Sequence, residues 1–172
     1  MNAEELRQLQ APLKSRYREL PESAKITSVA TGTLLHDRPA CRVHTRTGTF
    51  DAGLHPAAGG DGVDKCSIEL LLEAFVSCAG VTFNLVATAM NIPFRSVTVT
   101  AESDGDIRGA LGIAKDVPVG ATAVRLKFEV DSTATDEQLQ VLLRQTERYC
   151  VVYQTFKNPP PIEVTVRRSV GV

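Results

Sequence analysis

Apolar residues recur at helical spacing near the start of the chain. Residues 3–18 carry Leu6, Leu9 and Leu13 among charged and polar side chains. This pattern predicts a solvated helix with a single weak apolar stripe, and Pro21 ends it. We expect this helix to lie on the surface rather than in the core.

Two longer apolar patterns predict the major helices. After Ser67, a suitable N-cap, apolar positions continue around most of the helical cylinder until Ile92-Pro93, which indicates a central, mostly buried helix. A capping-box sequence at Thr135 begins a second helix that runs to about Cys150. The apolar positions are Ile68, Leu71, Leu72, Phe75, Cys78, Ala79, Leu85, Val86 and Ala89 in the first helix, and Leu139, Leu142, Leu143 and Thr146 in the second.

Alternating or β-branched runs predict short strands between turn sequences. The first three are separated by tight turns and form a predicted meander, and the last one closes the domain. A glycine-rich loop at residues 56–65 and an irregular excursion at 104–120, with one helical turn near 107–111, connect the other elements. The expected strands span residues 26–34, 40–45, 48–54, 96–101, 123–130 and 162–166.

Strands combined with two major helices, and no repeat or linker, predict one α+β domain over residues 1–172, built on a mostly antiparallel sheet. The composition agrees, because 43% apolar and 23% charged residues form an ordinary globular mixture. A disordered chain and a disulfide scaffold are excluded. The net charge of −1 also lacks the broad positive field of a nucleic-acid binder.

The start of the chain is acidic and has neither the basic nor the apolar region of a secretory signal peptide. We therefore expect a cytoplasmic protein with reduced thiols. Residues 70–92 are apolar enough to suggest a membrane span, but they include Glu73 and Asn84 and have no flanking basic cluster. We interpret this stretch as a buried helix and expect no membrane partner.

The four cysteines are Cys41, Cys66, Cys78 and Cys150. Cys78 lies on the apolar stripe of the first major helix and Cys150 at the end of the second, where free cysteine commonly serves as a small apolar core residue. The chain has no Cys-x-x-Cys pair and no histidine in a ligand pattern beside a cysteine. We therefore predict no metal and no cofactor.

Two segments resemble the OsmC/Ohr-like family. The first runs from Gly59-Gly60-Asp61-Gly62 through the helix opening at Ser67 to Ser77-Cys78, and the second is Glu147-Arg148-Tyr149-Cys150-Val151-Val152-Tyr153. The order of strands and helices is similar as well, over residues 26–170. Residues 1–21 resemble the N-terminal helical extension of a subset of this family.

The resemblance implies an OsmC-like fold, an intertwined homodimer and thiol-dependent reduction of hydroperoxides in oxidative-stress defence. Cys78 would be the peroxidatic thiolate, and Cys150 would condense with its sulfenic acid to a disulfide that an external dithiol reduces. The thiolate is the nucleophile, so this role requires groups that favour ionisation of Cys78.

In the family's peroxidases an arginine and a glutamate supply this environment. Arg38, in the turn between the first two predicted strands, is the candidate arginine, with Arg42 and Arg46 as rivals. The glutamate position, ten residues before Cys78, is Ile68 here, and Glu69 follows it. Glu69 is therefore the candidate substitute, although one residue turns a helical side chain by about 100°.

A rival interpretation is an OsmC-fold protein without peroxidase turnover, which binds a small molecule or senses redox state; Ile68 favours it. Cys66 precedes the helix where the family's peroxidases usually have asparagine, and Cys41 is expected to pack in a strand. Glu73 is expected either at the dimer seam or in solvent. Four aromatic residues are candidates for a substrate pocket or for the core, namely Phe75, Phe83, Tyr149 and Tyr153.

Overall fold

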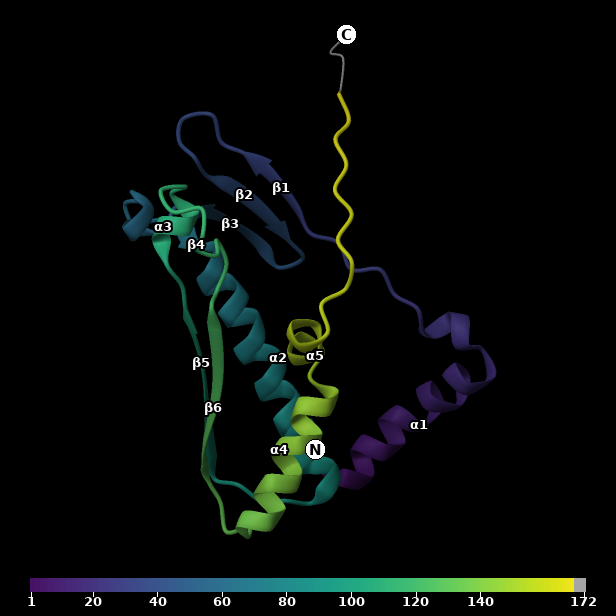
Figure 1. Ribbon diagram of the computed structural model, residues 1–172. Coiled ribbons are helices and arrows are strands. Elements are labelled where there is room, and N and C mark those ends of the chain that lie inside the picture. The colour runs from purple at the N-terminus through teal and green to yellow at the C-terminus, as the bar shows by residue number, and fades with distance from the viewer. Residues whose placement is uncertain (169–172) are drawn as a thin grey trace.

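The structure is a computed structural model, and it describes residues 1–168 (Figure 1). Two small sheets, two long helices and an N-terminal helical arm make up the chain, as expected for an α+β protein. Residues 169 and 170, the end of the predicted core, lie outside the described part.

The first sheet has four strands in the order β1-β2-β3-β4. The strands are β1 (Thr31–Leu34), β2 (Cys41–Thr45), β3 (Gly48–Gly53) and the short β4 (Lys65–Cys66). The first three form the predicted antiparallel meander, and β4 adds in parallel to β3. The predicted first strand is too long, because β2 ends opposite Thr31 and residues 26–30 have no partner there.

The second sheet is a two-stranded antiparallel ribbon of β5 (Ser96–Asp104) and β6 (Ala123–Asp131). Both strands alternate half-buried and exposed residues, so one face of the ribbon covers the core. The connection between them contains α3 (Ile107–Ala110), close to the predicted helical turn. A short 3-10 turn, η2 (Pro56–Ala58), precedes β4.

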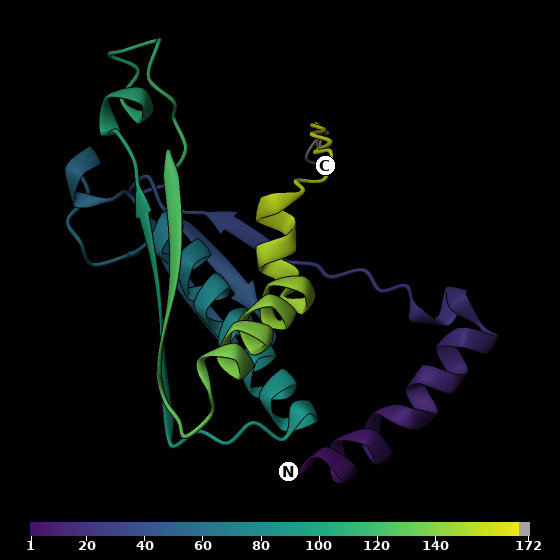
Figure 2. The same ribbon diagram turned by 60° about the horizontal axis from the view of Figure 1, so that its bottom comes forward.

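The central helix is α2 (Ser67–Met90), as predicted. It ends at Asn91, whose φ of 53° places it in the left-handed region that terminates helices, and Pro93 follows. Figures 1 and 2 show α2 between the β5–β6 ribbon and the C-terminal helices. Within one protomer only part of its surface is buried: Leu71, Val81 and Leu85 remain exposed.

The second long helix, α4 (Asp136–Tyr149), starts with the predicted capping box, in which Thr135 and Gln138 exchange hydrogen bonds. It is followed by α5 (Val151–Lys157), which was not predicted. The predicted closing strand at 162–166 is wrong for the isolated protomer. These residues are exposed and pair with none of the described strands.

The N-terminal helix α1 (Ala3–Glu19) has a capping box between Asn2 and Glu5 and is followed by the 3-10 turn η1 (Pro21–Ala24). Only Ala3 and Leu6 of α1 are buried. The expectation of a largely solvated surface helix is confirmed for the protomer. Figure 2 shows it running away from the rest of the chain.

Two clusters form the core along α2. One is centred on Phe83, Ala87 and Leu142, where α2 meets α4, and Phe128 of β6 stacks on Phe83 with ring centroids 5.0 Å apart. The other is centred on Phe75, Ala79 and Cys150, where α2 meets the junction of α4 and α5. The second cluster contains both cysteines of the predicted pair.

Candidate functional site

Cys78 lies in the middle of α2 and is half-buried. It packs on the cluster of Phe75, Ala79 and Cys150, against the β5–β6 ribbon on one side and α5 on the other. The helical spacing of the apolar residues therefore turns Cys78 inward, toward the second cysteine.

Cys150 joins the two C-terminal helices, since it is the C-cap of α4 and the N-cap of α5. Its extended backbone, with φ −72° and ψ 110°, bends the chain there. The side chain is only 1% exposed, and its Sγ accepts a hydrogen bond of 3.4 Å from the N–H of Tyr153. Both thiols are free in this structure.

The two cysteines differ in acidity. Burial by itself raises the pKa of Cys78, but hydrogen bonds to its sulfur outweigh that effect, led by the backbone N–H of Val152 and the thiol of Cys150. The N–H of Val151 and the hydroxyl of Thr82 are further donors. The pKa of the Cys78 thiol is therefore lower than that of an ordinary cysteine.

For Cys150 the balance is reversed. Burial is the largest influence and raises the pKa of the Cys150 thiol, and the neighbouring Cys78 sulfur raises it further. Hydrogen bonds from the N–H groups of Tyr153 and Val152 act in the opposite direction without overcoming the rise. Cys78 thus ionises first while Cys150 keeps its proton, so the site contains one nucleophile and one adjacent thiol.

A cavity of about 230 Å³ lies beside the cluster that holds this pair, although neither cysteine lines it. Its walls are apolar and aromatic, and three of its residues also belong to the cluster that holds the cysteines. Of the aromatic candidates, Phe75 and Tyr153 line it, whereas Phe83 is buried in the other cluster and Tyr149 is exposed. The full lining is Phe75, Val124, Leu126, Tyr153, Phe156 and Lys157.

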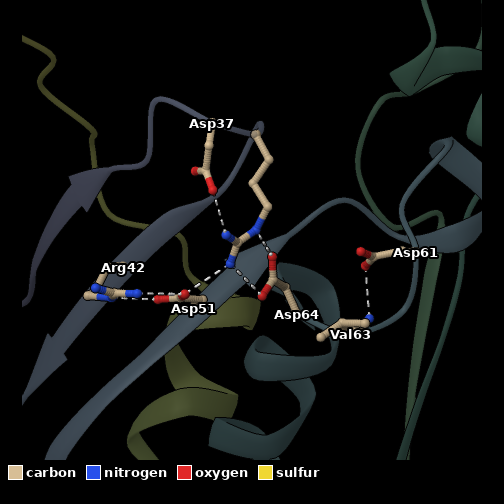
Figure 3. Close-up of polar contacts among 7 residues, drawn as sticks. Asp37, Arg42, Asp51, Asp61, Val63 and Asp64 are labelled. Atoms are coloured by element: carbon tan, nitrogen blue, oxygen red, sulfur yellow. Dashed lines mark hydrogen bonds and ion pairs between the residues drawn. The ribbon is translucent and has the colours of Figure 1, made fainter.

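Arg38 lies in the predicted turn, and three aspartates hold its guanidinium. These aspartates, Asp37, Asp51 and Asp64, are labelled in Figure 3. Its Nε and Nη2 donate to the two carboxylate oxygens of Asp64 at 2.9 and 3.1 Å, and Nη2 also donates to Asp51 at 3.0 Å. A Cβ on Gly53 would come within 2.8 Å of the Asp64 side chain, so glycine there lets Asp64 approach. The hydrogen bonds to Asp64 raise the pKa of Arg38, which stays charged.

The other charged candidates also lie away from the thiol pair within the protomer. Arg42 donates from its Nε to Asp51 at 2.8 Å, and Arg46 is exposed in the β2–β3 turn. Glu69 is exposed in the first turn of α2. It precedes Cys78 by nine residues, about 14 Å along a helix axis, so its carboxylate does not reach Cys78 of the same chain.

The remaining candidates from the sequence are Glu73, Cys66 and Cys41. Glu73 is exposed and pairs with Lys65, whose Nζ lies 3.0 Å from its carboxylate. Cys66 is buried at the start of α2, and Cys41 is half-buried in β2. Within residues 1–168, no group of three or more His, Cys, Asp or Glu side chains is placed to hold a metal ion.

The backbone donors of α5 are not evident from the sequence. The resemblance implied a charged side chain near Cys78, whereas in the protomer the N–H groups of Val152 and Val151 contribute to lowering its pKa. Val152, Tyr153 and Phe156 have a spacing compatible with a further helical turn. That spacing could have predicted α5, but not that its first N–H groups face Cys78.

Comparison with known proteins gives one family. A family model described as OsmC-like protein matches residues 60–165, more than half of the chain. No curated protein matches the sequence.

Solved structures share the fold. An OsmC-like protein from Mycoplasma pneumoniae superposes with a TM-score of 0.65 at 15% identity, over 78% of this chain and 90% of the other. An organic hydroperoxide resistance protein OsmC from Legionella pneumophila gives 0.58 at 17% identity, over 78% and 92%. The organic hydroperoxide resistance protein OhrB of Bacillus subtilis gives 0.52 at 18% identity, over 78% and 93%. At these identities the likeness establishes the fold alone.

Proposed function

The chain belongs to the family of OsmC-like proteins, and from that premise we propose that it is a thiol-dependent hydroperoxide reductase. Cys78 is the peroxidatic residue and Cys150 the resolving residue. The observation that carries this proposal is the placement of two free thiols, from α2 and from the junction of α4 and α5, in one apolar cluster. The lowered pKa of Cys78 and the raised pKa of Cys150 support the assignment of roles.

The reaction follows from this arrangement. The Cys78 thiolate attacks the terminal oxygen of the hydroperoxide, which carries the hydrogen, and the O–O bond breaks. The departing alkoxide takes a proton from solvent and leaves as an alcohol. Cys78 is now a sulfenic acid. The Cys150 thiol displaces its hydroxyl as water, which forms a disulfide. An external dithiol then supplies two electrons and two protons, restores both thiols and leaves as its own disulfide.

The apolar cavity beside the pair supports an organic hydroperoxide as substrate. Phe75 and Tyr153 belong both to the cavity wall and to the cluster around the cysteines. In the proposed complex, an alkyl or aryl group occupies this cavity, beside the cluster that contains Cys78. The two relatives named above as organic hydroperoxide resistance proteins agree with this substrate class.

The surface area supports an intertwined homodimer. The protomer exposes 13190 Å², whereas a compact monomer of its mass, 18.6 kDa, exposes about 8,200 Å². The excess of roughly 5,000 Å² is several times the ~800 Å² that each partner buries in a standard interface. The exposed apolar face of α2, with Val81 and Leu85, is the part of this surface nearest the site.

In the proposed dimer, Arg38 and Glu69 of one subunit can act on the Cys78 thiol of the other. Glu69 is too far along α2 to meet its own Cys78. In the proposed site it therefore acts on the thiol of the partner subunit, across paired α2 helices. Arg38 acts there only by exchanging its contacts with Asp51 and Asp64 for the thiolate.

A cytoplasmic location fits the proposed chemistry, because a dithiol reductant requires a reducing compartment. Helix α2 is long and apolar enough to cross a membrane by length and composition, with mean hydropathy 1.8. The core helix of a soluble protein meets the same criteria, and α2 packs against the ribbon and α4.

A second candidate function is redox sensing or small-molecule binding without turnover. Two observations favour it. Ile68 occupies the position where the family's peroxidases carry glutamate, and Arg38 is engaged by Asp37, Asp51 and Asp64. In this case the same pair forms a disulfide slowly, without efficient reduction by a dithiol.

One experiment separates the two functions. Reduced protein is mixed with cumene hydroperoxide and dihydrolipoamide, and peroxide loss is followed for the wild type, Cys78→Ser and Cys150→Ser. We expect continued peroxide loss with the wild type and only background loss with Cys78→Ser. Cys150→Ser cannot form the intramolecular disulfide, so we expect its repeated turnover through that disulfide to be absent.

Cys41→Ser is the matched control, since it removes a half-buried thiol outside the site, and it should keep the wild-type rate. A wild-type rate equal to that of Cys78→Ser would refute the peroxidase proposal. Disulfide formation without turnover would establish the second candidate instead.

A further inference from the structure

The N-terminal arm, defined here as residues 3–30, contacts the body of the protomer only near its ends. Ala3 and Leu6 are buried at the start of α1, which meets the C-terminal end of α2, and β1 follows the arm directly. No residue between Arg7 and Pro39 is fully buried. Figures 1 and 2 show α1 leading away from the body and residues 25–30 returning to β1, so that the arm forms an arch.

One face of α1 is apolar along its whole length. With about 100° between successive residues, Leu6, Leu9, Leu13 and Tyr17 fall on a single narrow stripe. Leu6 is buried, but Leu9, Leu13 and Tyr17 are 59%, 45% and 39% exposed. The stripe thus starts in contact with the protomer and continues where the protomer offers no surface.

The opposite face of α1 is polar and satisfied within the helix. Gln8 donates to Glu4 at 3.4 Å, and Ser15 donates to Glu19 at 3.0 Å. The helix is therefore suited to lie between solvent on one side and an apolar surface on the other. The matched family region begins only at residue 60, so the arm lies outside it.

We propose that the apolar stripe of α1 docks on a second copy of this chain, so that the arm of each subunit clasps its partner. This inference rests on the homodimer proposed above. Three observations select a second copy as the occupant. The arm leaves the protomer beside the C-terminal end of α2, whose exposed apolar face includes Val81 and Leu85. A subunit seated on that face would extend toward α1.

The second observation is the arch itself. Because the arm returns to its own β1, a partner that contacts the stripe is enclosed between arm and body, as in an intertwined dimer. The third is the surface excess of roughly 5,000 Å², which is several times the ~800 Å² that each partner buries in a standard interface. The arm supplies a separate part of that excess.

The test introduces charge on the stripe with Leu9→Glu/Leu13→Glu. The matched control, Gln8→Glu/Ser15→Glu, adds the same charge to the polar face, and glutamate keeps helix propensity in both. The dimer dissociation constant is measured by sedimentation over a dilution series. We expect it to rise about 100-fold or more for the stripe variant and to stay within about threefold of wild type for the control.

A truncated chain lacking residues 1–20 should show the same weakening. If a variant fails to fold, hydrogen exchange of the wild type decides, since α1 amides beyond residue 6 should be protected at dimer concentrations and should lose that protection on dilution. A dimeric wild type with unchanged affinity in the stripe variant and unprotected α1 amides would overturn the clasp while leaving the dimer and the peroxidase intact.

A monomeric wild type would overturn both the clasp and the dimer.

A membrane surface is the alternative occupant, because the basic residues Arg7, Lys14 and Arg18 lie beside the stripe. The same proteins are therefore also mixed with phosphatidylglycerol vesicles. Vesicle binding that depends on Leu9 and Leu13, without any effect on dimer affinity, would assign the stripe to a membrane surface and overturn the proposal.

Discussion

Thr82 lies one turn of α2 beyond Cys78, and its hydroxyl is among the donors that reach the Cys78 sulfur. Because Thr82 is buried, this donor is shielded from competing water. The resemblance to the OsmC/Ohr-like family selected Cys78 and Cys150 as the proposed pair. The donors around them were not predictable, since a threonine on an apolar helix is ordinarily a packing residue.

Thr82→Val tests the hydroxyl at nearly constant volume. The substitution should raise the pKa of Cys78, because a hydrogen bond to the thiolate is lost while burial is unchanged. The measurement is the pH dependence of iodoacetamide alkylation of Cys78 in a Cys150→Ser background. Its midpoint should lie below the ordinary thiol value of about 8.5 and move upward in the variant.

Thr88→Val, on the same helix beyond the site, is the control and should leave the midpoint in place. A midpoint that Thr82→Val does not move would remove Thr82 from the site.

The lowered pKa of Cys78 also fixes how its contribution to the free energy of unfolding changes with pH. Between the lowered pKa of Cys78 and the unfolded value, the unfolded chain holds the extra proton, so the contribution of Cys78 to stability rises with pH and is lost as pH falls.

At the scale of elements, α5 positions the site through its first residues. Cys150 has the extended backbone that a residue before proline requires, and Val151 is the first residue of α5, where proline is well tolerated. Val151 is also largely exposed, so its side chain contributes little packing.

Val151→Pro should therefore remove one backbone donor to Cys78 and keep the helix. We expect a higher pKa of Cys78 and a several-fold lower rate of peroxide reduction at pH 7, which recovers as pH is raised. Val151→Ala, which keeps the N–H, is the control. Equal pH profiles for the two variants would show that this N–H does not tune the thiol.

Local sequence predicts some helices and strands of this protein better than others. The capping boxes of α1 and α4 and the alternation of β6 are local features, and the corresponding elements form where expected. The segment 162–166 alternates equally well but follows Pro159, Pro160 and Pro161, and its apolar residues are exposed. A strand requires a partner edge, and alternation alone does not provide one.

At the scale of the whole molecule, the open shape of the protomer is its main property. In the proposed dimer, a second subunit covers the exposed face of α2 and part of the excess surface. Val81, near the middle of α2 and close to Cys78 in sequence, is 70% exposed in the protomer.

Val81→Glu should dissociate the proposed dimer without unfolding the protomer, because the side chain has few contacts within its own chain. Val119→Glu is a matched control, since Val119 is 73% exposed on the connection between β5 and β6. Light scattering after gel filtration gives the mass, and circular dichroism checks the fold. A Val81→Glu protein that remains dimeric would show that the interface lies elsewhere.

The sequence by itself determined the long helices, the meander and the fold class, because these depend on periodicity and residue type within short windows. The choice of Cys78 and Cys150 as a pair came from the resemblance to the OsmC/Ohr-like family. The tertiary structure alone decided that Cys150 lies beside Cys78, that backbone N–H groups of α5 face the sulfur, and that Arg38 is engaged by aspartates. These contacts join segments far apart in the chain, and their geometry is set by how α2, α4 and α5 pack together.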